Sequence, residues 1–383
     1  MRYYIIAGEA SGDLHGSNLI LELKKLDLDA TIRCWGGDLM EQAGATVVKH
    51  YRELAFMGFV EVLMNIRTIY KNLRFCKNDI SGFQPDALVL VDYPGFNLRI
   101  AEWAKQNGIP VIYYISPQVW AWKENRVNSI RVNVDKMLVI LPFEEEFYRK
   151  WNYQVEYVGH PLVDVADRAQ KELQPIPESI GSPLNEPRII ALLPGSRKQE
   201  VIKKLPVMLE ISRYFPDHTF IVAKAASLDD TFYESLMKTF PKVRSVRNKT
   251  YHLLSHATAA LVTSGTATLE TALFGVPQVV CYKGSPVSYL IAKKLVKIKY
   301  ISLVNLIMNR EVVKELIQDD LNIENLKREL HEILGNPQRR EKIVGDYNML
   351  KSLLKKGGNA SFNAAQSIYR FVKSVTSAKK PVG

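Results

Sequence analysis

Cysteine is scarce in this sequence of 383 residues, which contains only Cys34, Cys76 and Cys281, far apart from one another. Three widely spaced cysteines form neither a disulfide framework nor a zinc site, so we expect reduced thiols in the core of a cytoplasmic protein. Long apolar runs are also missing, since none approaches the ~18 residues that a membrane-spanning helix needs. The short apolar stretch that ends at Gly8 lacks a small-residue cleavage site, which argues against a signal peptide.

The sequence also has no low-complexity tract and no short internal repeat. Hydrophobic residues make up 47% and charged residues 24%, which are ordinary globular values, and the length predicts two domains. Lys and Arg number 51 against 40 Asp and Glu, and this net charge of +11 favours an anionic partner. Because the basic residues are scattered and form no helix-turn-helix, RNP or zinc-finger pattern, nucleic acid is disfavoured relative to a membrane surface or a phosphorylated substrate.

Short apolar runs recur along the chain, each followed by a polar turn and a helical pattern. They do not alternate apolar with polar residues, so they predict strands that are buried on both faces, as in a parallel sheet. The runs are residues 3–7, 87–91, 111–115 and 137–141 in the first half and 188–193, 218–223, 259–262 and 277–282 in the second. An α/β fold with two parallel sheets follows from this pattern.

Residues 166–187 interrupt the rhythm, because they are rich in proline and glycine and carry no apolar stripe. We expect an exposed linker there. Beyond about Asn322 the pattern is helical and basic. The predicted domains are therefore 1–165 and 188–345, followed by C-terminal helices over 346–383.

Acidic side chains follow two of the predicted strands in the first half. Glu9 and Asp13 lie in a glycine-rich turn after the first strand, and Asp92 ends the most apolar strand. Ligands of doubly wound sheets bind at the carboxyl ends of the strands, and two carboxylates suit hydroxyl groups better than a phosphate. Partial desolvation raises the proton affinity of a carboxylate, so we expect Asp92 to act as a general base. The structural alternative is that these residues only cap helices.

A third loop holds two tryptophans, Trp120 and Trp122, in the segment Ser116-Pro-Gln-Val-Trp-Ala-Trp. Flat indole rings suit the face of a sugar or an acyl chain, and plain packing in the core is an equally good explanation.

Two loops in the second half favour a diphosphate. Leu193-Pro-Gly-Ser-Arg-Lys-Gln-Glu places a glycine, the hydroxyl of Ser196, the guanidinium of Arg197 and Glu200 between a strand and a helix. It is not a Walker loop, since no Gly-Lys-Ser or Gly-Lys-Thr follows. The stretch from Thr263 to Glu270 repeats the theme with small hydroxyl residues at a helix start. Glu270 fits a ribose diol, or it simply favours the amino end of its helix.

Five motifs in order carry a family resemblance, and although each is weak alone, together they are highly specific. They are Gly8-Glu-Ala-Ser-Gly-Asp, Ser116-Pro-Gln-Val-Trp-Ala-Trp, Leu192-Leu-Pro-Gly-Ser-Arg, Ser264-Gly-Thr-Ala-Thr-Leu-Glu and Ser302-Leu-Val-Asn. With these motifs the chain resembles the lipid-A-disaccharide synthases from its first strand to about Gln318. The resemblance implies a GT-B fold, with two Rossmann-like domains facing across a cleft and C-terminal helices that pack back on the first domain. In some members these helices exchange between two subunits, which implies a homodimer.

The family joins UDP-2,3-diacylglucosamine to 2,3-diacylglucosamine 1-phosphate, forming a β-1,6-linked lipid A disaccharide 1-phosphate and UDP in lipopolysaccharide biosynthesis. The resemblance implies that this inverting hexosyltransferase needs no metal or other cofactor. It implies that Glu9, Asp13 and Asp92 lie on the acceptor side. The residues it places around UDP are Ser196, Arg197, Ser264, Gly265, Thr266, Thr268, Glu270 and Asn305. The family often has proline at Val304, so we expect a less rigid loop beside Asn305.

Two choices stay open at this point. The base is Asp92, or else Glu9. The enzyme is a synthase, or else another GT-B enzyme such as a UDP-N-acetylglucosamine 2-epimerase, which shares the UDP loops but needs no surface for acyl chains.

Residues 55–77 predict a helix at a membrane surface. Phe59, Leu63, Ile66, Tyr70 and Leu73 form one apolar stripe that packs on the first domain. Phe56, Met57, Val60 and Met64 widen the apolar surface, and Arg67, Lys71 and Arg74 follow as a basic row. Apolar side chains beside a basic row are what an interfacial helix on an anionic leaflet requires. Because acylated acceptors come from a bilayer, we expect a peripheral protein on the inner face of the bacterial inner membrane.

Overall fold

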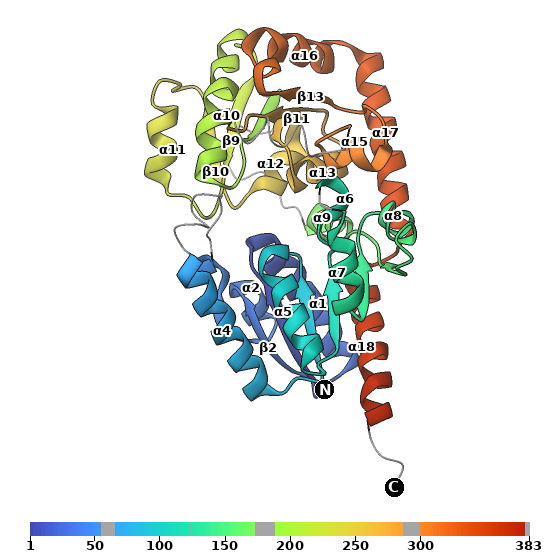
Figure 1. The fold of residues 1–383 in the computed structure, drawn as a ribbon. Helices are drawn as coiled ribbons and strands as arrows, with labels where there is room; N and C mark the ends of the chain where they lie inside the picture. Colours follow the sequence, from blue (N-terminus) through green and yellow to red (C-terminus); the bar gives the residue numbers. More distant parts are fainter. Residues whose placement is uncertain (55–65, 123, 173–187, 286–298, 380–383) are drawn as a thin grey trace. The chain divides into compact units, whose positions relative to one another are not determined.

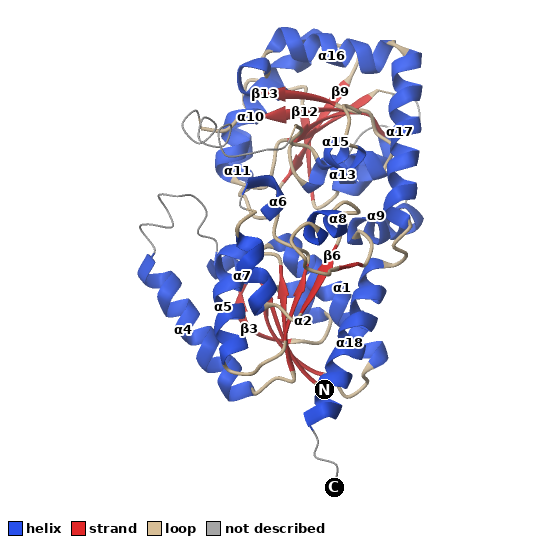
Figure 2. Ribbon diagram, turned by 45° about the vertical axis from the view of Figure 1, so that its right-hand side comes forward, coloured by secondary structure: helices blue, strands red, loops and turns tan. Residues whose placement is uncertain are grey.

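The computed structural model describes residues 1–54, 66–122, 124–172, 188–285 and 299–379 (Figure 1). The chain divides into two compact units, Met1–Pro161 with Lys355–Gly383, and Leu162–Leu354. Each unit contains one sheet in which every pairing is parallel, with helices on both faces (Figure 2). The predicted α/β class with two parallel sheets is therefore confirmed.

The first unit has a seven-stranded sheet in the order β3-β2-β1-β4-β5-β6-β7. Its strands are β1 (Arg2–Ala7), β2 (Thr31–Gly36), β3 (Thr46–His50), β4 (Ala87–Val91), β5 (Val111–Tyr114), β6 (Lys136–Val139) and β7 (Glu156–Tyr157). Its helices are α1 (Ala10–Leu26), α2 (Asp38–Gln42), α4 (Ile66–Phe83), α5 (Pro94–Gln106), α6 (Val119–Trp122), α7 (Arg126–Asn133), α8 (Glu144–Arg149) and α18 (Ala360–Lys379), with a 3-10 turn at Tyr51–Leu54.

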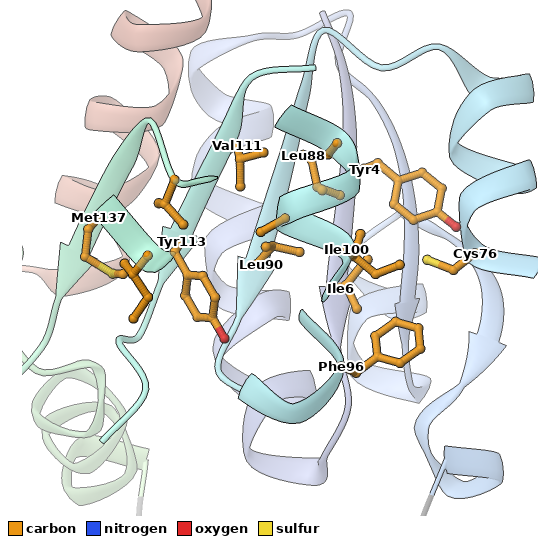
Figure 3. Close-up of a cluster of buried hydrophobic side chains, with 14 of the residues drawn as sticks. Tyr4, Ile6, Cys76, Leu88, Leu90, Phe96, Ile100, Val111, Tyr113 and Met137 are labelled. Atoms are coloured by element: carbon orange, nitrogen blue, oxygen red, sulfur yellow. The ribbon is translucent and has the colours of Figure 1, made fainter. Parts of the chain in front are cut away.

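One cluster of core residues in the first unit lies between this sheet and helices α4, α5 and α7. Figure 3 shows Cys76 from α4 and Phe96 and Ile100 from α5 beside the sheet residues Tyr4 and Ile6. On α4 the buried side chains are Leu73, Cys76 and Ile80, at the spacing of one helical face. Tyr70 is 67% exposed, so its predicted place in the packed stripe is wrong. The predicted apolar residues over 55–65 lie outside the described residues.

The C-terminal helix α18 packs on α1 of the same unit. Its inner face carries small and aliphatic residues that are fully buried, namely Ala360, Ala364, Ala365, Ile368 and Val372. Alanines allow two helix backbones to approach closely. Asn363 and Ser367 add hydrogen bonds to Val158 O (3.1 Å) and Glu156 Oε2 (2.7 Å). The predicted return of the C-terminal helices to the first domain is confirmed for α18.

The second unit has a six-stranded sheet in the order β10-β9-β8-β11-β12-β13. Its strands are β8 (Ile189–Leu193), β9 (Thr219–Lys224), β10 (Arg244–Arg247), β11 (Ala257–Thr263), β12 (Gln278–Tyr282) and β13 (Lys314–Ile317). Its helices are α9 (Pro161–Glu172), α10 (Lys198–Glu210), α11 (Asp230–Met237), α12 (Thr250–His256), α13 (Thr266–Leu273), α15 (Leu303–Met308), α16 (Ile323–Gly335) and α17 (Pro337–Lys355), with 3-10 turns at Ile211–Tyr214 and Gln318–Asp320.

Two stretches differ from the expected domain plan. Residues 166–172 belong to α9 instead of a linker, because Leu162, Val163 and Ala166 form a buried face. The remaining part of the predicted linker, 173–187, lies outside the described residues. Most of α17 belongs to the second unit, where Tyr347 is buried and Asp346 forms an ion pair with Arg310 (2.8 Å).

Candidate functional site

Each sheet has one point at which the strand order reverses. In the first unit the chain runs from β1 outward to β2 and β3, and then returns to β4 on the other side of β1. Ala7 and Val91, the last residues of β1 and β4, are register partners. Ligands of doubly wound sheets bind in the crevice outside such a switch point. Glu9 and Asp92, predicted from sequence, follow these two neighbouring strands.

Asp92 stands on strained backbone that the surrounding structure fixes. Asp92 and Tyr93 both adopt positive φ angles, 45° and 51°, which cost non-glycine residues of order 1 kcal/mol each. The carbonyl of Asp92 accepts hydrogen bonds from Asn97 Nδ2 (2.7 Å) and from the buried Tyr113 hydroxyl (2.6 Å). Strain held in this way is typical of functional sites, because it sets the direction of one side chain. Sequence analysis missed Asn97 and Tyr113, whose partners are backbone atoms.

Glu9 is the N-cap residue of α1, in extended conformation, and its side chain is half-buried. The ring of Tyr93 lies against Gly8, in the space that a side chain at position 8 would fill. Burial and the nearby Glu9 carboxylate both raise the pKa of Tyr93. Glu9 and the residue after Asp92 are therefore neighbours at the switch point.

Asp13 has a structural task. Its carboxylate is buried and accepts backbone hydrogen bonds from Gly37 (2.7 Å), Met40 (3.1 Å) and Leu39 (3.2 Å). These donors belong to the free amino end of α2, which a carboxylate stabilises. Asp13 thus ties α1 to the loop after β2.

The tryptophan loop is anchored by a buried carboxyl group that sequence analysis missed. Trp120 is buried, donates its Nε1 hydrogen to Glu144 Oε1 (3.2 Å) and packs edge-on against Phe143. The other Glu144 oxygen accepts from the backbone of Leu141 (2.9 Å) and Ile140 (3.2 Å). Packing therefore accounts for Trp120, while the side chain of Trp122 lies outside the described ones.

The second unit has its switch point between β8 and β11, where Leu193 and Val262 are register partners. Each strand runs into a glycine with positive φ, Gly195 at 118° and Gly265 at 133°. Both values are in the region that favours glycine. The two predicted diphosphate loops therefore lie side by side at this point.

The first of these loops presents Ser196 and Arg197 to solvent. Arg197 is the N-cap residue of α10, and its guanidinium lies 3.8 Å from Glu200 Oε1. Glu200 folds back over Gly195, into space that a side chain at position 195 would occupy. The carboxylate thereby faces the guanidinium and leaves half of the Arg197 side chain exposed (52%).

The second loop exposes Gly265 and Thr266 at the amino end of α13. Ser264 Oγ donates to Ile301 O (2.8 Å), and the buried Thr268 donates to Gly265 O (2.8 Å). These two hydroxyls therefore shape the loop, while its exposed end offers backbone N–H groups and the positive helix terminus that bind phosphates.

Glu270 lies about one turn into α13, and Tyr251 donates a hydrogen bond to its Oε1 (3.3 Å). Removal from solvent raises the pKa of the Glu270 carboxyl, and the Tyr251 hydrogen bond opposes that rise. An acceptor held in this way suits a neutral diol.

Asn305 is fully buried, and protein groups occupy its side-chain amide. Its Nδ2 donates to Val313 O (2.8 Å) and Glu315 Oε1 (2.9 Å), and its Oδ1 accepts from the backbone of Val312 (2.8 Å) and Val313 (3.0 Å). Glu315, another residue that sequence analysis missed, also accepts from Ser302 N and Oγ. This network holds the loop beside Val304. A direct contact between Asn305 and a nucleotide would break one of these bonds.

Comparison with known proteins decides which family carries these motifs. The family model described as lipid-A-disaccharide synthetase matches residues 3–369. A lipid-A-disaccharide synthase of Syntrophus aciditrophicus is 40% identical over 97% of this chain and 98% of its own length. One from Coxiella burnetii is 37% identical over 97% and 98%. The chain belongs to the lipid-A-disaccharide synthase family.

Solved structures similar to this synthase-family chain show its fold. The UDP-GlcNAc 2-epimerase of Neisseria meningitidis superposes with a TM-score of 0.67 at 14% identity, covering 97% of this chain and all of the other. A calicheamicin glycosyltransferase superposes with a TM-score of 0.60 at 16% identity, covering 98% and 99%. The predicted GT-B class, with two Rossmann-like domains, is thereby confirmed.

In the part of the chain that the structure describes, none of the helices combines the length and the hydropathy that a membrane span requires. The same residues contain no group of three or more histidine, cysteine, aspartate or glutamate side chains that could hold a metal ion.

Proposed function

We propose that this protein transfers a 2,3-diacylglucosaminyl group from UDP to 2,3-diacylglucosamine 1-phosphate and releases UDP and a β-1,6-linked disaccharide 1-phosphate. Family membership supports the assignment. The structural observation that carries it is the different chemistry at the two switch points. Asp92 and Glu9 stand at the first, whereas Arg197 and the free end of α13 stand at the second.

The first unit supplies the base in this proposal. An α-linked donor that gives a β-linked product requires one inverting displacement. The acceptor 6-hydroxyl oxygen attacks the anomeric carbon and loses its proton to Asp92, while the bond from that carbon to the diphosphate oxygen breaks. Asp92 is preferred to Glu9 because Asn97 and Tyr113 fix its backbone. Asp13 keeps its place at α2 and supports the turn.

The second unit binds the nucleotide in this proposal. Arg197 and Ser196 meet the diphosphate from one loop, and the backbone N–H groups of Gly265 and Thr266 meet it from the other. As UDP leaves, its growing negative charge is stabilised by the guanidinium and by the positive end of α13. Glu270 accepts from the ribose. Glu200, Ser264, Thr268 and Asn305 hold these groups in place.

We propose that no metal ion takes part, because in this mechanism the Arg197 guanidinium and the amino end of α13 supply the positive charge that stabilises the leaving diphosphate. A UDP-N-acetylglucosamine 2-epimerase is the second candidate. It is not favoured, because relatives at 36–40% identity are named synthases and the epimerase is similar at 14% identity. That likeness shows the fold alone.

We also propose that α4 docks on an anionic membrane, at the inner face of the bacterial inner membrane. Tyr70 (67%) and Phe75 (46%) are exposed on α4 together with the predicted basic row, Arg67, Lys71 and Arg74. A groove of ≈ 690 Å³ between α4 and α5 is lined by Arg74, Lys77 and Arg99 against one carboxylate, Glu102. Cations beside exposed aromatic rings suit the headgroups of anionic lipids.

We also propose that the protein forms a homodimer in which the two subunits exchange their C-terminal helices. Gly357 and Gly358 join α17 to α18, and Gly358 has a φ of 70°. A turn of this kind can reopen to pass α18 to a second copy. Sedimentation equilibrium of the full chain measures the subunit number.

The test of the proposed reaction is incubation with both diacylated sugars in detergent, with UDP and disaccharide 1-phosphate measured by mass spectrometry. We expect both products in equal amounts, with and without EDTA. A parallel reaction with UDP-N-acetylglucosamine alone tests epimerisation. Epimer formation without disaccharide would replace the proposal with the second candidate, and activity abolished by EDTA and restored by a divalent cation would overturn the metal-free mechanism.

A further inference from the structure

Lys204 is a buried lysine in the middle of α10, the helix that connects β8 to β9. Its residue is 3% exposed, and it lies on the inward face of α10 with Val201, Leu205 and Met208. Lysine is almost never fully buried without a partner, because its charge loses hydration. An amphipathic helix would place an apolar residue at such a position. The burial of Lys204 therefore calls for an explanation.

The ammonium group reaches the switch point between β8 and β11. Its Nζ donates a hydrogen bond to Oγ1 of Thr263, the last residue of β11. Ser264, Gly265 and Thr266 follow directly and form the loop that starts α13. Lys204 thus holds Thr263, the residue directly before the proposed diphosphate loop.

The surroundings of Lys204 act on its pKa in both directions. Burial lowers its pKa, and Arg197 and Lys203 lower it further, whereas Glu200 and Cys281 raise it. Burial raises the pKa of the Cys281 thiol to about 12, so that group carries no charge near neutral pH. Glu200 is the one carboxylate among these neighbours, and it also faces Arg197 (3.8 Å).

The first two turns of α10, with the N-cap residue, carry an excess of positive charge. Residues 197–204 contain four cations and one carboxylate, namely Arg197, Lys198, Lys203, Lys204 and Glu200. Arg197 and Lys198 lie at the amino end itself, where the macrodipole is unfavourable for cations unless an anion binds there. The buried ammonium, its hydroxyl partner and this excess charge all favour a bound anion at the same loop.

We infer that Lys204 is a positioning residue for the diphosphate of the nucleotide: it holds Thr263 and the 264–266 loop and adds a buried positive charge beneath them. The inference rests on the proposed function, since it takes UDP as the anion. Lys204 acts through Thr263, so its side chain does not need to contact the nucleotide.

The test compares the Lys204→Met and Lys204→Gln variants with the wild-type chain by calorimetry. UDP and uridine are the two probes, because they differ only in the diphosphate. We expect Lys204→Met to bind UDP 5- to 50-fold more weakly and uridine within twofold of wild type. Lys204→Gln keeps a hydrogen-bond donor for Thr263 but removes the charge, so its UDP affinity should lie between those of wild type and Lys204→Met. Lys242→Met, at an exposed position before the amino end of β10, is the matched control and should stay within twofold for both ligands.

Thermal melting of each variant shows that it is folded, and Lys204→Gln carries the comparison if Lys204→Met does not fold. Unchanged UDP affinity in a folded variant would overturn the inference. Equal losses for UDP and uridine would also overturn it, since they would show a structural role alone. A wild-type chain that binds no UDP would instead refute the proposed function, and the inference with it.

Discussion

The ring of Tyr93 occupies the space above Gly8 in which any other residue would place its side chain. This contact joins the turn after β1 to the turn after β4, the two turns that form the switch point of the first unit. Glu9 follows Gly8 and Asp92 precedes Tyr93 in the sequence, so the contact also brings these two residues near each other. The glycine at position 8 is therefore needed for the arrangement of the two carboxylates.

A Gly8→Ala substitution tests this contact. The added methyl group would clash with the ring, so we expect a loss of about 1–3 kcal/mol in the free energy of unfolding and a clear fall in turnover. Gly95→Ala is the matched control, because a Cβ there meets no atom within 4 Å. Denaturant unfolding of the wild type and of both variants measures the free energy of unfolding. A Gly8→Ala variant as stable as the wild type would contradict the expectation.

Asp92→Asn should lower turnover by about 10²-fold or more, which is the usual contribution of a general base. UDP affinity should hardly change, because the groups proposed to bind UDP belong to the second unit. Steady-state kinetics and calorimetry measure the two effects. If Asp92→Asn keeps nearly full activity while Glu9→Gln is inactive, then Glu9 is the base.

Arg197→Ala should weaken UDP binding by about 1.5–3 kcal/mol, the range for a charge-assisted hydrogen bond to a phosphate. Arg213→Ala is the control, since Arg213 also pairs with a glutamate on its own chain segment (2.8 Å). Calorimetry with UDP measures both. An unchanged affinity in Arg197→Ala would remove this residue from the site.

The buried carboxyl group of Glu144 should make the free energy of unfolding depend on pH. Burial raises the pKa of Glu144 from its ordinary value of 4.5 to about 7. The folded state therefore holds the proton more tightly than the unfolded state. The resulting stabilisation is complete below about pH 4.5 and is lost as the pH rises through 7.

Between pH 5 and pH 8 the wild-type chain should therefore lose roughly 2–3 kcal/mol more stability than Glu144→Gln, which cannot ionise. Denaturant unfolding of both proteins at the two pH values measures the difference. Parallel pH profiles would show that this carboxyl group does not titrate in that range.

Membrane docking by α4 predicts that charge removal on its exposed face weakens vesicle binding. Arg67, Lys71 and Arg74 changed together to Gln should reduce sedimentation with anionic vesicles at least about tenfold, since each cation contributes ~1 kcal/mol. The melting temperature should not fall, because all three side chains are exposed. Lys238, Lys242 and Arg244, also exposed, provide a control triple variant in the second unit. Equal binding by both triple variants would refute docking through α4.

The sequence alone determined the parallel α/β class, the central strands and the loops that follow them. Strands such as β4 and β11 are buried on both faces, so their apolar runs are unbroken and easily recognised. The edge strands β3, β7, β10 and β13 and the neighbouring β2 were missed. They are short or carry polar residues, such as Arg33, whose guanidinium pairs with Asp79 on α4 (2.6 Å). Tertiary contacts, and no local pattern, stabilise them.

The motifs also determined which residues gather at the two switch points, but only the tertiary structure decided what each one does. Asp13 and Asn305 stand in family motifs, as Arg197 does, yet backbone groups of other segments occupy their side chains: residues 37–40 for Asp13 and residues 312–313 for Asn305. The sequence analysis did not single out Lys204 or Glu144, and both are buried. A motif records which residue types a turn contains. Whether a polar group faces a ligand or the protein depends on hydrogen-bond partners that are far away in sequence and become neighbours only when the chain folds.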